Sequence, residues 1–509
     1  MIEGTRYPPR MDDSRPPLAL IPWPASVDVR AGEWSIREQT RVLLDEHLPD
    51  SMARVARGFS TSSQLPTSTG SGVAGDIVWR QLPVRAAEGT ETDAENESYR
   101  LTVDQGRVVV EAGAVEGFLR AEATLRQLGP RFPAIEIMDQ PSFPWRGLLL
   151  DCSRHFVPVD RIHRLLEQLA EHKMNRFHWH LTDDQGWRLA VEAYPRLAEV
   201  AAWRRREDGA YGGCYDPDDV RDVVRRAQEL GITVVPEIEL PGHSTAALAA
   251  YPELACTDGP FEVETEWGVF DDVYCAGKDE TLRFLERVFE QVLEQFPGVY
   301  VHVGGDECPK TRWKDCARCQ QRIRDEGLRD EDHLQTWFVD HFGRFLSERN
   351  RRFIGWDEIL AGGLPPGAIV QSWQGVKGAV AAARAGHDTV VSPMSHCYLD
   401  FNLAHLDLRR AYEFDPVPPE LGPDEVHHVL GGECNLWTER APPEKLDERI
   451  FPRMLATAER LWTGSGQTFP DFEARLDLHQ PRLEARGVRF GEREDPGYNP
   501  DDRFDWSLP

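Results

Sequence analysis

Short apolar segments alternate with long amphipathic stretches from residue 146 onward, and this alternation restricts the possible folds more than any other feature. The apolar segments are Gly147–Cys152, Asn175–Leu181, Ile232–Glu237, Val299–Val303, Arg352–Trp356, Ala368–Trp373, Thr389–Ser392 and Val429–Glu433. The stretches with helical spacing are Val159–Lys173, Pro217–Leu230, Asp279–Phe296, His333–Arg349 and Gly375–Ala385. Strands and helices in alternation indicate a parallel sheet, and eight such strands predict an α/β fold of the (β/α)8 TIM barrel type.

The N-terminal part of the chain has a different pattern. Tyr99–Val103 and Arg107–Glu111 flank an Asp-Gln-Gly turn and predict a β-hairpin, and helical spacing follows over Ala114–Leu128 until Gly129-Pro130. The stretch Phe59–Asp76 is rich in Ser, Thr and Gly and is predicted to be a loop. We therefore predict a small α+β accessory domain over residues 1–141 and a barrel domain over residues 142–509.

The net charge of −28, from 58 Lys and Arg against 86 Asp and Glu, argues against a nucleic-acid partner. Phosphate binding requires clustered positive charge.

No run of about 18 consecutive apolar residues is present, so no membrane-spanning helix is expected. Residues Met1–Ser14 carry charges and prolines where a secretory signal needs an apolar core, which favours a cytoplasmic protein. A secreted protein whose leader had been removed would show the same N-terminus.

Polar and aromatic residues gather where the predicted strands end. In a (β/α)8 barrel the carboxyl ends of the strands form the face at which ligands bind. In chain order these ends carry Asp151 and Arg154, His178 to Asp184, Glu237 to His243, Asp306 and Glu307, Trp356 to Glu358, Gln371 to Trp373, Tyr398 to Asp400, and Glu433 to Glu439. Buried carboxylates are costly unless they are paired, so a purely structural barrel would not need this collection.

Three tryptophans at strand ends, Trp356, Trp373 and Trp437, are expected to form an aromatic pocket together with Tyr398. Sugar rings have apolar C–H faces that stack on aromatic walls, while Asp, Glu and Arg bind the hydroxyl groups. A single tryptophan is more often part of the core. The shared location of these three favours a carbohydrate site.

The consecutive acids Asp306 and Glu307 indicate the chemistry of this site. Most glycosidases use two carboxylates about 5 to 9 Å apart on either side of the scissile bond. Neighbouring side chains on an extended segment point to opposite sides, so these two are not expected to face each other across one bond. This predicts that Glu307 is the acid/base, that Asp306 holds another part of the substrate, and that the nucleophile comes from the substrate. A pair of purely structural carboxylates is the alternative.

Seven stretches of the barrel region resemble the family 20 glycoside hydrolases, the β-N-acetylhexosaminidases. They are Arg146–Phe156 (RGLLLDCSRHF), Met174–Arg188 (MNRFHWHLTDDQGWR), Val235–His243 (VPEIELPGH), Val301–Cys308 (VHVGGDEC), Gly355–Ile359 (GWDEI), Tyr398–Phe401 (YLDF) and Asn435–Glu439 (NLWTE). The fourth stretch contains the family's His-x-Gly-Gly-Asp-Glu signature. The first 140 residues resemble the small accessory domain of the family more loosely.

The resemblance implies an exo-acting, retaining and substrate-assisted hydrolysis of terminal non-reducing β-linked N-acetylglucosamine or N-acetylgalactosamine, in which the 2-acetamido oxygen attacks and forms an oxazolinium intermediate. Glu307 would protonate the leaving oxygen and later activate water, and we expect burial and the charge of Asp306 to raise the pKa of Glu307 for this task. The resemblance also implies that Asp306 orients the acetamido group, that Tyr398 donates a hydrogen bond to its oxygen, and that three tryptophans, Trp356, Trp373 and Trp437, enclose its methyl group. Arg154, Asp400 and Glu439 would bind the sugar hydroxyls. Asp183 and His243 would support Glu307.

Two other functions are left open by the residues. A metal-dependent barrel hydrolase is one, because His178-Trp179-His180 has the His-x-His form of strand-end metal ligands, although no further histidine pattern completes such a site. A non-catalytic carbohydrate-binding barrel is the other, but a binding module would not need a poised acid. We expect no cofactor and no metal; the expected partner is the sugar substrate, and the oligomeric state is left open.

Nine cysteines are too few for a disulfide scaffold. Cys308, Cys316 and Cys319 lie close together in the chain, but no fourth ligand at a matching spacing is found nearby. Reduced thiols or a local disulfide are therefore favoured over zinc. Cys256 and Cys275 flank a loop that contains a tryptophan and several acids, and a disulfide between them would close this loop in an exported protein.

Overall fold

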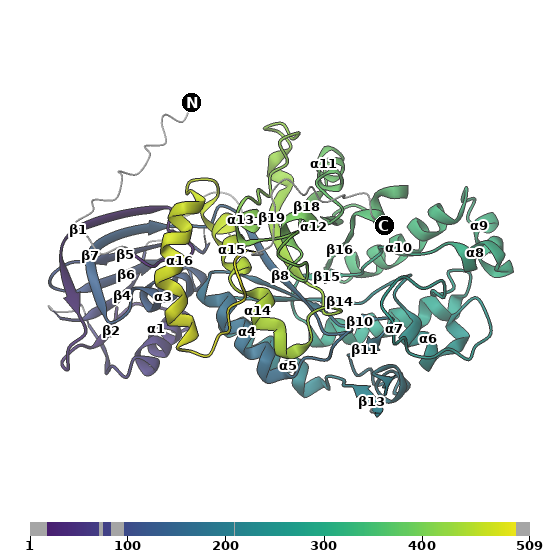
Figure 1. Ribbon diagram of the computed structural model, residues 1–509, viewed down its shortest axis with the longest axis horizontal. Coiled ribbons are helices and arrows are strands. Elements are labelled where there is room, and N and C mark those ends of the chain that lie inside the picture. Colours follow the sequence, from purple (N-terminus) through teal and green to yellow (C-terminus); the bar gives the residue numbers. More distant parts are fainter. Residues whose placement is uncertain (1–17, 71–74, 83–95, 208, 495–509) are drawn as a thin grey trace.

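The computed structural model describes residues 18–70, 75–82, 96–207 and 209–494, which form a β-sheet domain followed by a barrel (Figure 1). Within these residues eight parallel strands close the barrel in the order β14-β15-β16-β17-β18-β19-β8-β9. The strands are β8 (Trp145–Asp151), β9 (Arg176–His180), β14 (Thr233–Glu237), β15 (Tyr300–His302), β16 (Arg352–Trp356), β17 (Ile369–Ser372), β18 (Asp388–Val391) and β19 (Val429–Leu436). The predicted (β/α)8 fold is confirmed, and each predicted strand overlaps an observed one.

Amphipathic helices surround the barrel. They include α4 (Val159–Glu171), α5 (Pro217–Glu229), α7 (Asp279–Gln295), α10 (Glu331–Ser347), α11 (Lys377–Arg384), α13 (Leu408–Tyr412) and α15 (Arg453–Thr463). Helix α5 shows why such a segment is helical: Asp216 caps its first turn by accepting from the backbone N–H groups of Asp218 and Asp219, and Pro217 occupies the first position. Its apolar residues recur at helical spacing and are buried against the barrel.

The barrel interior is layered. Near the amino ends of the strands an apolar cluster fills the barrel, and it consists of Trp145, Val235, Ile354, Ile369 and Val390. Toward the carboxyl ends the next inward-facing side chains are polar and fully buried, and they are His178, Glu237, His302, Gln371 and Glu433. The apolar layer closes the bottom of the barrel, so only the carboxyl ends are available for a ligand site.

In the N-terminal domain, seven strands of the described chain form one sheet in the order β1-β7-β5-β6-β4-β2-β3. These are β1 (Ser26–Ser35), β2 (Val42–Leu44), β3 (Thr67–Thr69), β4 (Ile77–Gln81), β5 (Tyr99–Val103), β6 (Val108–Ala112) and β7 (Arg131–Asp139). Helices α1 (Asp50–Ser62) and α3 (Val115–Leu128) cover one face of the sheet (Figure 1). The predicted hairpin is confirmed, because β5 and β6 pair in antiparallel fashion from Val103 and Val108 outward.

The loop predicted for Phe59–Asp76 is wrong in part. Helix α1 continues to Ser62 because Phe59 faces the core of the sheet domain, where it is 3% exposed. Thr67–Thr69 forms strand β3, which pairs in parallel with β2 at the edge of the sheet. Residues 71–74 of the predicted loop lie outside the described residues. Backbone pairing with an edge strand therefore overrides the turn-like composition.

Helix α16 (Phe469–Glu484) packs its apolar face on the barrel core and also contacts the N-terminal domain (Figure 1). Arg475 donates to the backbone oxygen of Leu20 at 2.6 Å, and an imidazole nitrogen of His479 lies 2.9 Å from one of His172 at the end of α4. Trp462 of α15 is buried in the core of the sheet domain and donates to Asp139 at 2.9 Å. The end of the chain thus ties the two domains together.

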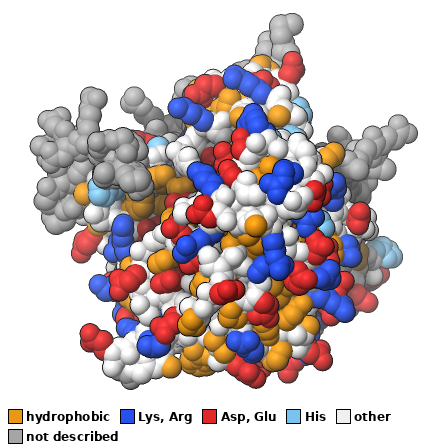
Figure 2. All heavy atoms as spheres, turned by 90° about the vertical axis from the view of Figure 1, so that its right-hand side faces the viewer, with side chains coloured by type: hydrophobic (Ala, Val, Ile, Leu, Met, Phe, Trp, Pro, Cys, Tyr) orange, Lys and Arg blue, Asp and Glu red, His pale blue; other side chains and the backbone are white. Residues whose placement is uncertain are grey.

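Figure 2 shows one face of the molecule on which acidic and basic side chains are interspersed, so the negative net charge does not gather into a single patch there. None of the described helices is both long and apolar enough to cross a membrane.

Candidate active site

Arg154 lies just beyond β8 and is surrounded by acids from other segments of the barrel. Its Nη2 atom lies 2.9 Å from Asp183 Oδ2 and 3.6 Å from Glu439 Oε1, and its Nε donates to Gln185 Oε1 at 3.1 Å. The guanidinium carbon lies 5.2 Å from the centroid of the Trp437 ring. Burial opposes the charge of Arg154, but the neighbouring acids, Asp183 first, outweigh it and raise the pKa. Arg154 is therefore a fixed cation at the carboxyl end of the barrel.

His243 follows β14 and lies between two acidic groups. Its Nδ1 atom is 3.2 Å from Asp183 Oδ1, and its Nε2 atom is 3.6 Å from both Asp306 Oδ2 and Glu307 Oε2. Burial lowers the pKa of this imidazole, but Asp183 and the other carboxylates raise it well above the ordinary histidine value. His243 is thus an imidazolium that links Asp183 to the Asp306-Glu307 pair, and these four predicted residues are brought together.

The segment between β15 and Glu307 is sharply turned. Gly304 and Gly305 have φ angles of +67° and +97°, and a Cβ atom at Gly304 would lie 1.7 Å from Glu239 Oε2, so glycine is required there. Glu307 itself has a φ of +43°. The prediction that Asp306 and Glu307 point to opposite sides of an extended segment is wrong, because left-handed residues turn the backbone and bring both carboxylates to the same nitrogen of His243.

The two acids nevertheless differ in environment. The side chain of Asp306 is 13% exposed, whereas that of Glu307 is 41% exposed. Burial, reinforced by the charges of Glu358 and Glu307, raises the pKa of Asp306 well above the ordinary aspartate value despite His243. The imidazole of His243, whose Nε2 lies 3.6 Å from Glu307 Oε2, lowers the pKa of Glu307 and outweighs its partial burial. The predicted rise in the pKa of Glu307 is therefore wrong for the substrate-free protein, because the nearest charge is an imidazolium and one side of the carboxylate faces water.

The four predicted aromatic residues form one wall. Tyr398 stacks on Trp373 at a centroid distance of 6.3 Å and lies 6.2 Å from Trp437, which in turn lies 6.0 Å from Trp356. The indole N–H groups of Trp356 and Trp373 are fixed by Glu237 at 2.9 Å and by Glu358 at 3.0 Å. Burial raises the pKa of Tyr398 well above its usual value, so its hydroxyl stays protonated and can donate a hydrogen bond.

Several buried polar atoms around this wall have no hydrogen-bond partner within the described chain. They include Asp306 Oδ1, Asp400 Oδ1 and Trp437 Nε1. Burial, together with the charge of Glu439, raises the pKa of Asp400 to about 7, and burial also raises the pKa of Glu439 against the effect of Arg154. Buried polar atoms in native proteins are nearly always paired, so a group of them without partners indicates a site for a polar ligand.

A layer of imidazoles and carboxylates lies directly beneath this site. From the sequence, His178 and His180 were considered only as possible metal ligands, and Glu237 and Glu433 were given no particular role. His178 Nδ1 lies 2.7 Å from Glu433, and His180 bridges Glu237 at 2.5 Å and Asp183 at 2.9 Å. Glu237 is also the acceptor for Trp356, so this layer holds the aromatic wall from below. The signal in the sequence is the alternation of inward-facing residues, since His180 and Glu237 occupy partnered positions of adjacent strands.

The same contacts bear on the metal-dependent alternative. Burial lowers the pKa values of His178 and His180, but their carboxylate neighbours more than compensate and raise them to about 9 and about 10. His178, Glu237 and His302 offer ligand atoms within 4.8 Å of one another, but in the described chain both histidines are paired with carboxylates. The His-x-His motif thus lies in a network of imidazoles and carboxylates beneath the aromatic wall.

A barrel whose carboxyl end carries an acid pair beside an imidazolium and an aromatic wall with unsatisfied polar atoms has the composition of a glycosidase active site. The family described as "Glycosyl hydrolase family 20, catalytic domain" matches residues 143–465, and "Glycosyl hydrolase family 20, domain 2" matches residues 18–140. The chain belongs to glycoside hydrolase family 20 and is a glycoside hydrolase.

Individual relatives agree with this assignment. A beta-hexosaminidase of Porphyromonas gingivalis is 43% identical over 79% of this chain, and this chain spans 55% of that protein, or about half its length. A beta-N-acetylhexosaminidase of Cellulomonas fimi is 32% identical over 93% of this chain and 96% of its own. The crystal structure of an exo beta-N-acetylglucosaminidase from Vibrio harveyi in complex with N-acetylglucosamine covers 94% of this chain and 79% of its own, with a TM-score of 0.83 and 31% identity.

Proposed function

We propose that this protein is an exo-acting, retaining β-N-acetylhexosaminidase that removes terminal non-reducing β-linked N-acetylglucosamine or N-acetylgalactosamine. The names of the relatives and the N-acetylglucosamine bound to the Vibrio harveyi enzyme support this substrate class. The observation that carries the proposal is the set of unpartnered atoms, Asp306 Oδ1, Asp400 Oδ1 and Trp437 Nε1, beside an aromatic wall. An acetamido sugar supplies both the N–H and hydroxyl groups for these atoms and an apolar methyl for the wall.

The partial exposure of Glu307 suits the acid/base role. Its carboxylate is accessible to a leaving-group oxygen, whereas that of Asp306 is enclosed. When a sugar displaces water from Glu307, burial increases and raises the pKa above its value in the free protein, so that the carboxyl group holds a proton. That proton passes to the leaving oxygen as the glycosidic bond breaks. In the second step the carboxylate takes a proton from water while the water oxygen bonds to the anomeric carbon, and the bond between that carbon and the acetamido oxygen breaks and restores the acetamide.

The nucleophile in this proposal is the carbonyl oxygen of the 2-acetamido group. The unpartnered Oδ1 atom of Asp306 accepts the acetamido N–H, and the protonated hydroxyl of Tyr398 donates to the acetamido oxygen. The positive charge that develops on the acetamido group then faces Asp306 in a water-poor pocket, where the stabilisation by a carboxylate is larger than in bulk water. Arg154, Asp400 and Glu439 bind the sugar hydroxyls and close the pocket behind the terminal residue, which accounts for exo action.

The distance between the two acids does not select this mechanism by itself. One oxygen of Asp306 and one of Glu307 lie within 4.8 Å of each other, and retaining glycosidases with a carboxylate nucleophile have a separation of about 5 to 5.5 Å. Family membership supports the substrate-assisted route, because family 20 is an exception to the mechanism in which two carboxylates of the enzyme act on the glycosidic bond.

A comparison of substrates tests the proposal. We expect turnover of the 4-nitrophenyl N-acetylglucosaminide to exceed that of the matching glucoside, which has a 2-hydroxyl group, by at least ~10²-fold, and a thiazoline mimic of the oxazolinium to inhibit competitively. Asp306→Asn should lower kcat strongly with a smaller change in KM. Equal turnover of the two substrates would reject the substrate-assisted mechanism, and equal turnover of N-acetylgalactosaminide would show that the 4-hydroxyl is not selected.

A further inference from the structure

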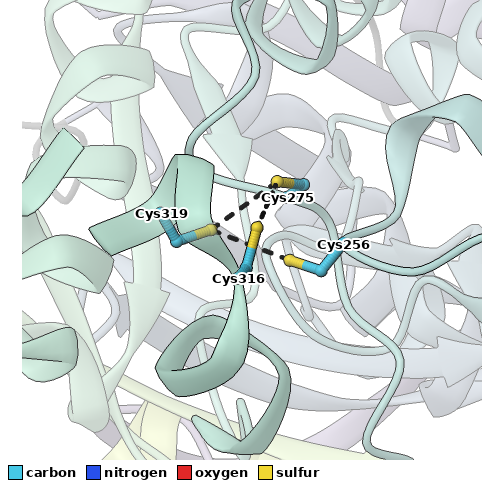
Figure 3. A group of neighbouring side chains, drawn as sticks. All are labelled: Cys256, Cys275, Cys316 and Cys319. Atoms are coloured by element: carbon cyan, nitrogen blue, oxygen red, sulfur yellow. Dashed lines mark hydrogen bonds between the residues drawn. The ribbon is translucent and has the colours of Figure 1, made fainter. Parts of the chain in front are cut away.

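Four cysteines from two separate loops meet at one point near the barrel rim. Cys256 and Cys275 bracket the loop that precedes α7, and Cys316 and Cys319 lie at the start of α9 (Ala317–Asp325). The four sulfur atoms point toward a common centre (Figure 3). The Sγ–Sγ distances are 3.7 Å for Cys256 to Cys319, 3.7 Å for Cys275 to Cys316 and 3.6 Å for Cys275 to Cys319, and all four sulfurs lie within 4.8 Å of one another.

These distances match four sulfurs around a tetrahedral zinc ion and do not match disulfide bonds. In a tetrahedral site with zinc–sulfur bonds of about 2.3 Å, neighbouring sulfurs are about 3.8 Å apart. Sulfurs in a disulfide are about 2.05 Å apart, and each sulfur has one close partner rather than two. Here Cys275 and Cys319 each have two sulfur neighbours at nearly equal distances. We propose that Cys256, Cys275, Cys316 and Cys319 together bind one structural zinc ion through their four thiolates.

The backbone around the cluster is built to bring the two loops into contact. A Cβ atom at Gly277 would lie 2.3 Å from the carbonyl carbon of Arg318 and 2.4 Å from the nitrogen of Cys319, so the first loop touches the start of α9 directly. Lys278 fixes the two ends of its loop by donating to the carbonyl oxygens of Glu253 at 2.8 Å and Ala255 at 2.6 Å. The ligand positions are therefore held in place by contacts other than the sulfurs.

The location also favours bound thiolates. Cys316 occupies the N-cap position of α9 without making a side-chain cap, and Cys319 is in the first turn, where the helix N-terminus stabilises negative charge. Zinc binds thiolates, so binding releases the thiol protons to the solvent. Four cysteines fill all positions of a tetrahedral ion and leave none for a water or a substrate, which is typical of a structural rather than a catalytic zinc site.

The proposed zinc would join two loops that both reach the active site. Glu266, in the loop between Cys256 and Cys275, accepts from Gln185 through its backbone oxygen at 2.8 Å, and Gln185 in turn accepts from Arg154 at 3.1 Å. The second loop begins directly after Glu307. The zinc site depends on the arrangement of the cysteines and of the two loops, and not on the identity of the substrate.

Metal analysis of the purified protein tests the proposal. The protein is produced with zinc in the medium, purified without chelator and analysed by inductively coupled plasma mass spectrometry. We expect about one zinc ion per chain. The double variant Cys275→Ser/Cys319→Ser should lose zinc by at least ~10-fold, because two of four ligands are removed. Cys308→Ser is the matched control: its sulfur contacts the backbone oxygen of Pro309, lies outside the four-sulfur group, and is expected to leave the zinc content unchanged.

A thiol count decides the question even if the double variant does not fold. The wild-type protein is denatured in the presence of a chelator and without reductant, and its thiols are titrated. A zinc site predicts nine free thiols, whereas two disulfides would leave five, because they would consume four of the nine. Five thiols, a zinc content that the double variant retains, iron in place of zinc, or a wild-type protein that stays free of zinc after incubation with the metal would each overturn the proposal.

Discussion

Buried carboxylates occur in two regions of this protein, and the two regions treat them in opposite ways. At the contact between the domains, Glu97 is fully partnered: its side chain is 4% exposed and lies 2.7 Å from Arg120 and 2.5 Å from Arg146. Burial alone would raise the pKa of Glu97, but the two guanidinium groups, Arg146 first, lower it to about 2. Asp139 nearby accepts from Lys173 at 2.6 Å and from Tyr99 at 2.7 Å.

Asp306 and Asp400, beside the aromatic wall, are 13% and 7% exposed but lack such partners. Asp306 and Asp400 each keep an oxygen without a hydrogen-bond partner in the described chain, and burial raises both pKa values, that of Asp400 to about 7. The difference between the regions is therefore one of matching rather than of burial. A structural carboxylate is paired with cations of the protein itself, whereas a buried carboxylate without such a partner can bind a ligand. A pKa shifted by burial in this way is typical of functional sites.

Removal of the matched charge at the domain contact should have the largest effect on stability. Glu97→Gln leaves Arg120 and Arg146 buried without an anion, and breaking a buried ion pair in this way costs about 3 to 5 kcal/mol. Urea denaturation should show this loss in the free energy of unfolding. The kcat of the folded protein should not change, because Glu97 lies at the opposite end of the barrel from the pocket. Glu116→Gln, on the exposed face of α3, is the matched control and should unfold like the wild type.

The destabilisation caused by Glu97→Gln should change with pH in a defined direction. The pKa of Glu97 is lowered to about 2 in the folded protein from 4.5, so its contribution is fully present above pH 4.5 and is lost as the pH falls toward about 2. The stability difference between wild type and Glu97→Gln should therefore shrink on acidification through this window. A difference that stays constant from neutral pH to about pH 3 would contradict the matched-charge interpretation.

Removal of the carboxylate at the mouth of the pocket should affect activity and leave stability almost unchanged. Glu307→Gln is expected to lower the turnover of 4-nitrophenyl N-acetylglucosaminide by at least ~10²-fold, the usual contribution of acid/base assistance. The loss should be larger for substrates with a poorer leaving group, since these depend more on protonation. Because Glu307 is 41% exposed, its thermal unfolding should match that of the wild type. A variant with wild-type turnover would show that Glu307 is not the acid/base.

The sequence is sufficient to predict most of the barrel and the membership of the pocket. Alternating strands and helices define the fold, and parallel strands place all of their carboxyl ends on one face, so residues as distant as Arg154 and Glu439 were expected at one site and lie 3.6 Å apart. These predictions succeed because they depend on strand order and direction, which a local pattern determines.

Two properties were not predictable because they depend on how loops fold between the strands. The pKa of Glu307 is lowered because positive φ angles at Gly304, Gly305 and Glu307 turn its carboxylate toward His243. The cysteine cluster joins residues that are 41 and 63 positions apart in the chain, Cys275 with Cys316 and Cys256 with Cys319. A search for a fourth ligand close to Cys308 in the sequence misses it, since the partners come from the preceding strand's loop.

Substitution of Asp400 should have the smallest effect, but it distinguishes the two regions most selectively. Its contribution to the free energy of unfolding depends on pH in the opposite direction to that of Glu97. Its pKa is raised from 3.8 to about 7 in the folded protein, so its contribution to stability is fully present below pH 3.8 and is lost as the pH rises toward 7. Asp400→Asn cannot ionise, and the variant should gain about 1.4 kcal/mol relative to wild type for each unit of pH between about 5 and 6.

The same variant should bind its substrate less well above pH 7, where Asp400 is ionised, with a rise in KM of about 10-fold, because one charged hydrogen bond to a sugar hydroxyl is replaced by a neutral one. Urea denaturation at several pH values measures the first effect and steady-state kinetics the second. Asp424→Asn, at an exposed position, is the control and should show neither. A stability gain that does not vary with pH would mean that Asp400 is already ionised in the folded protein, and its pocket would then be matched like the domain contact rather than left open for a ligand.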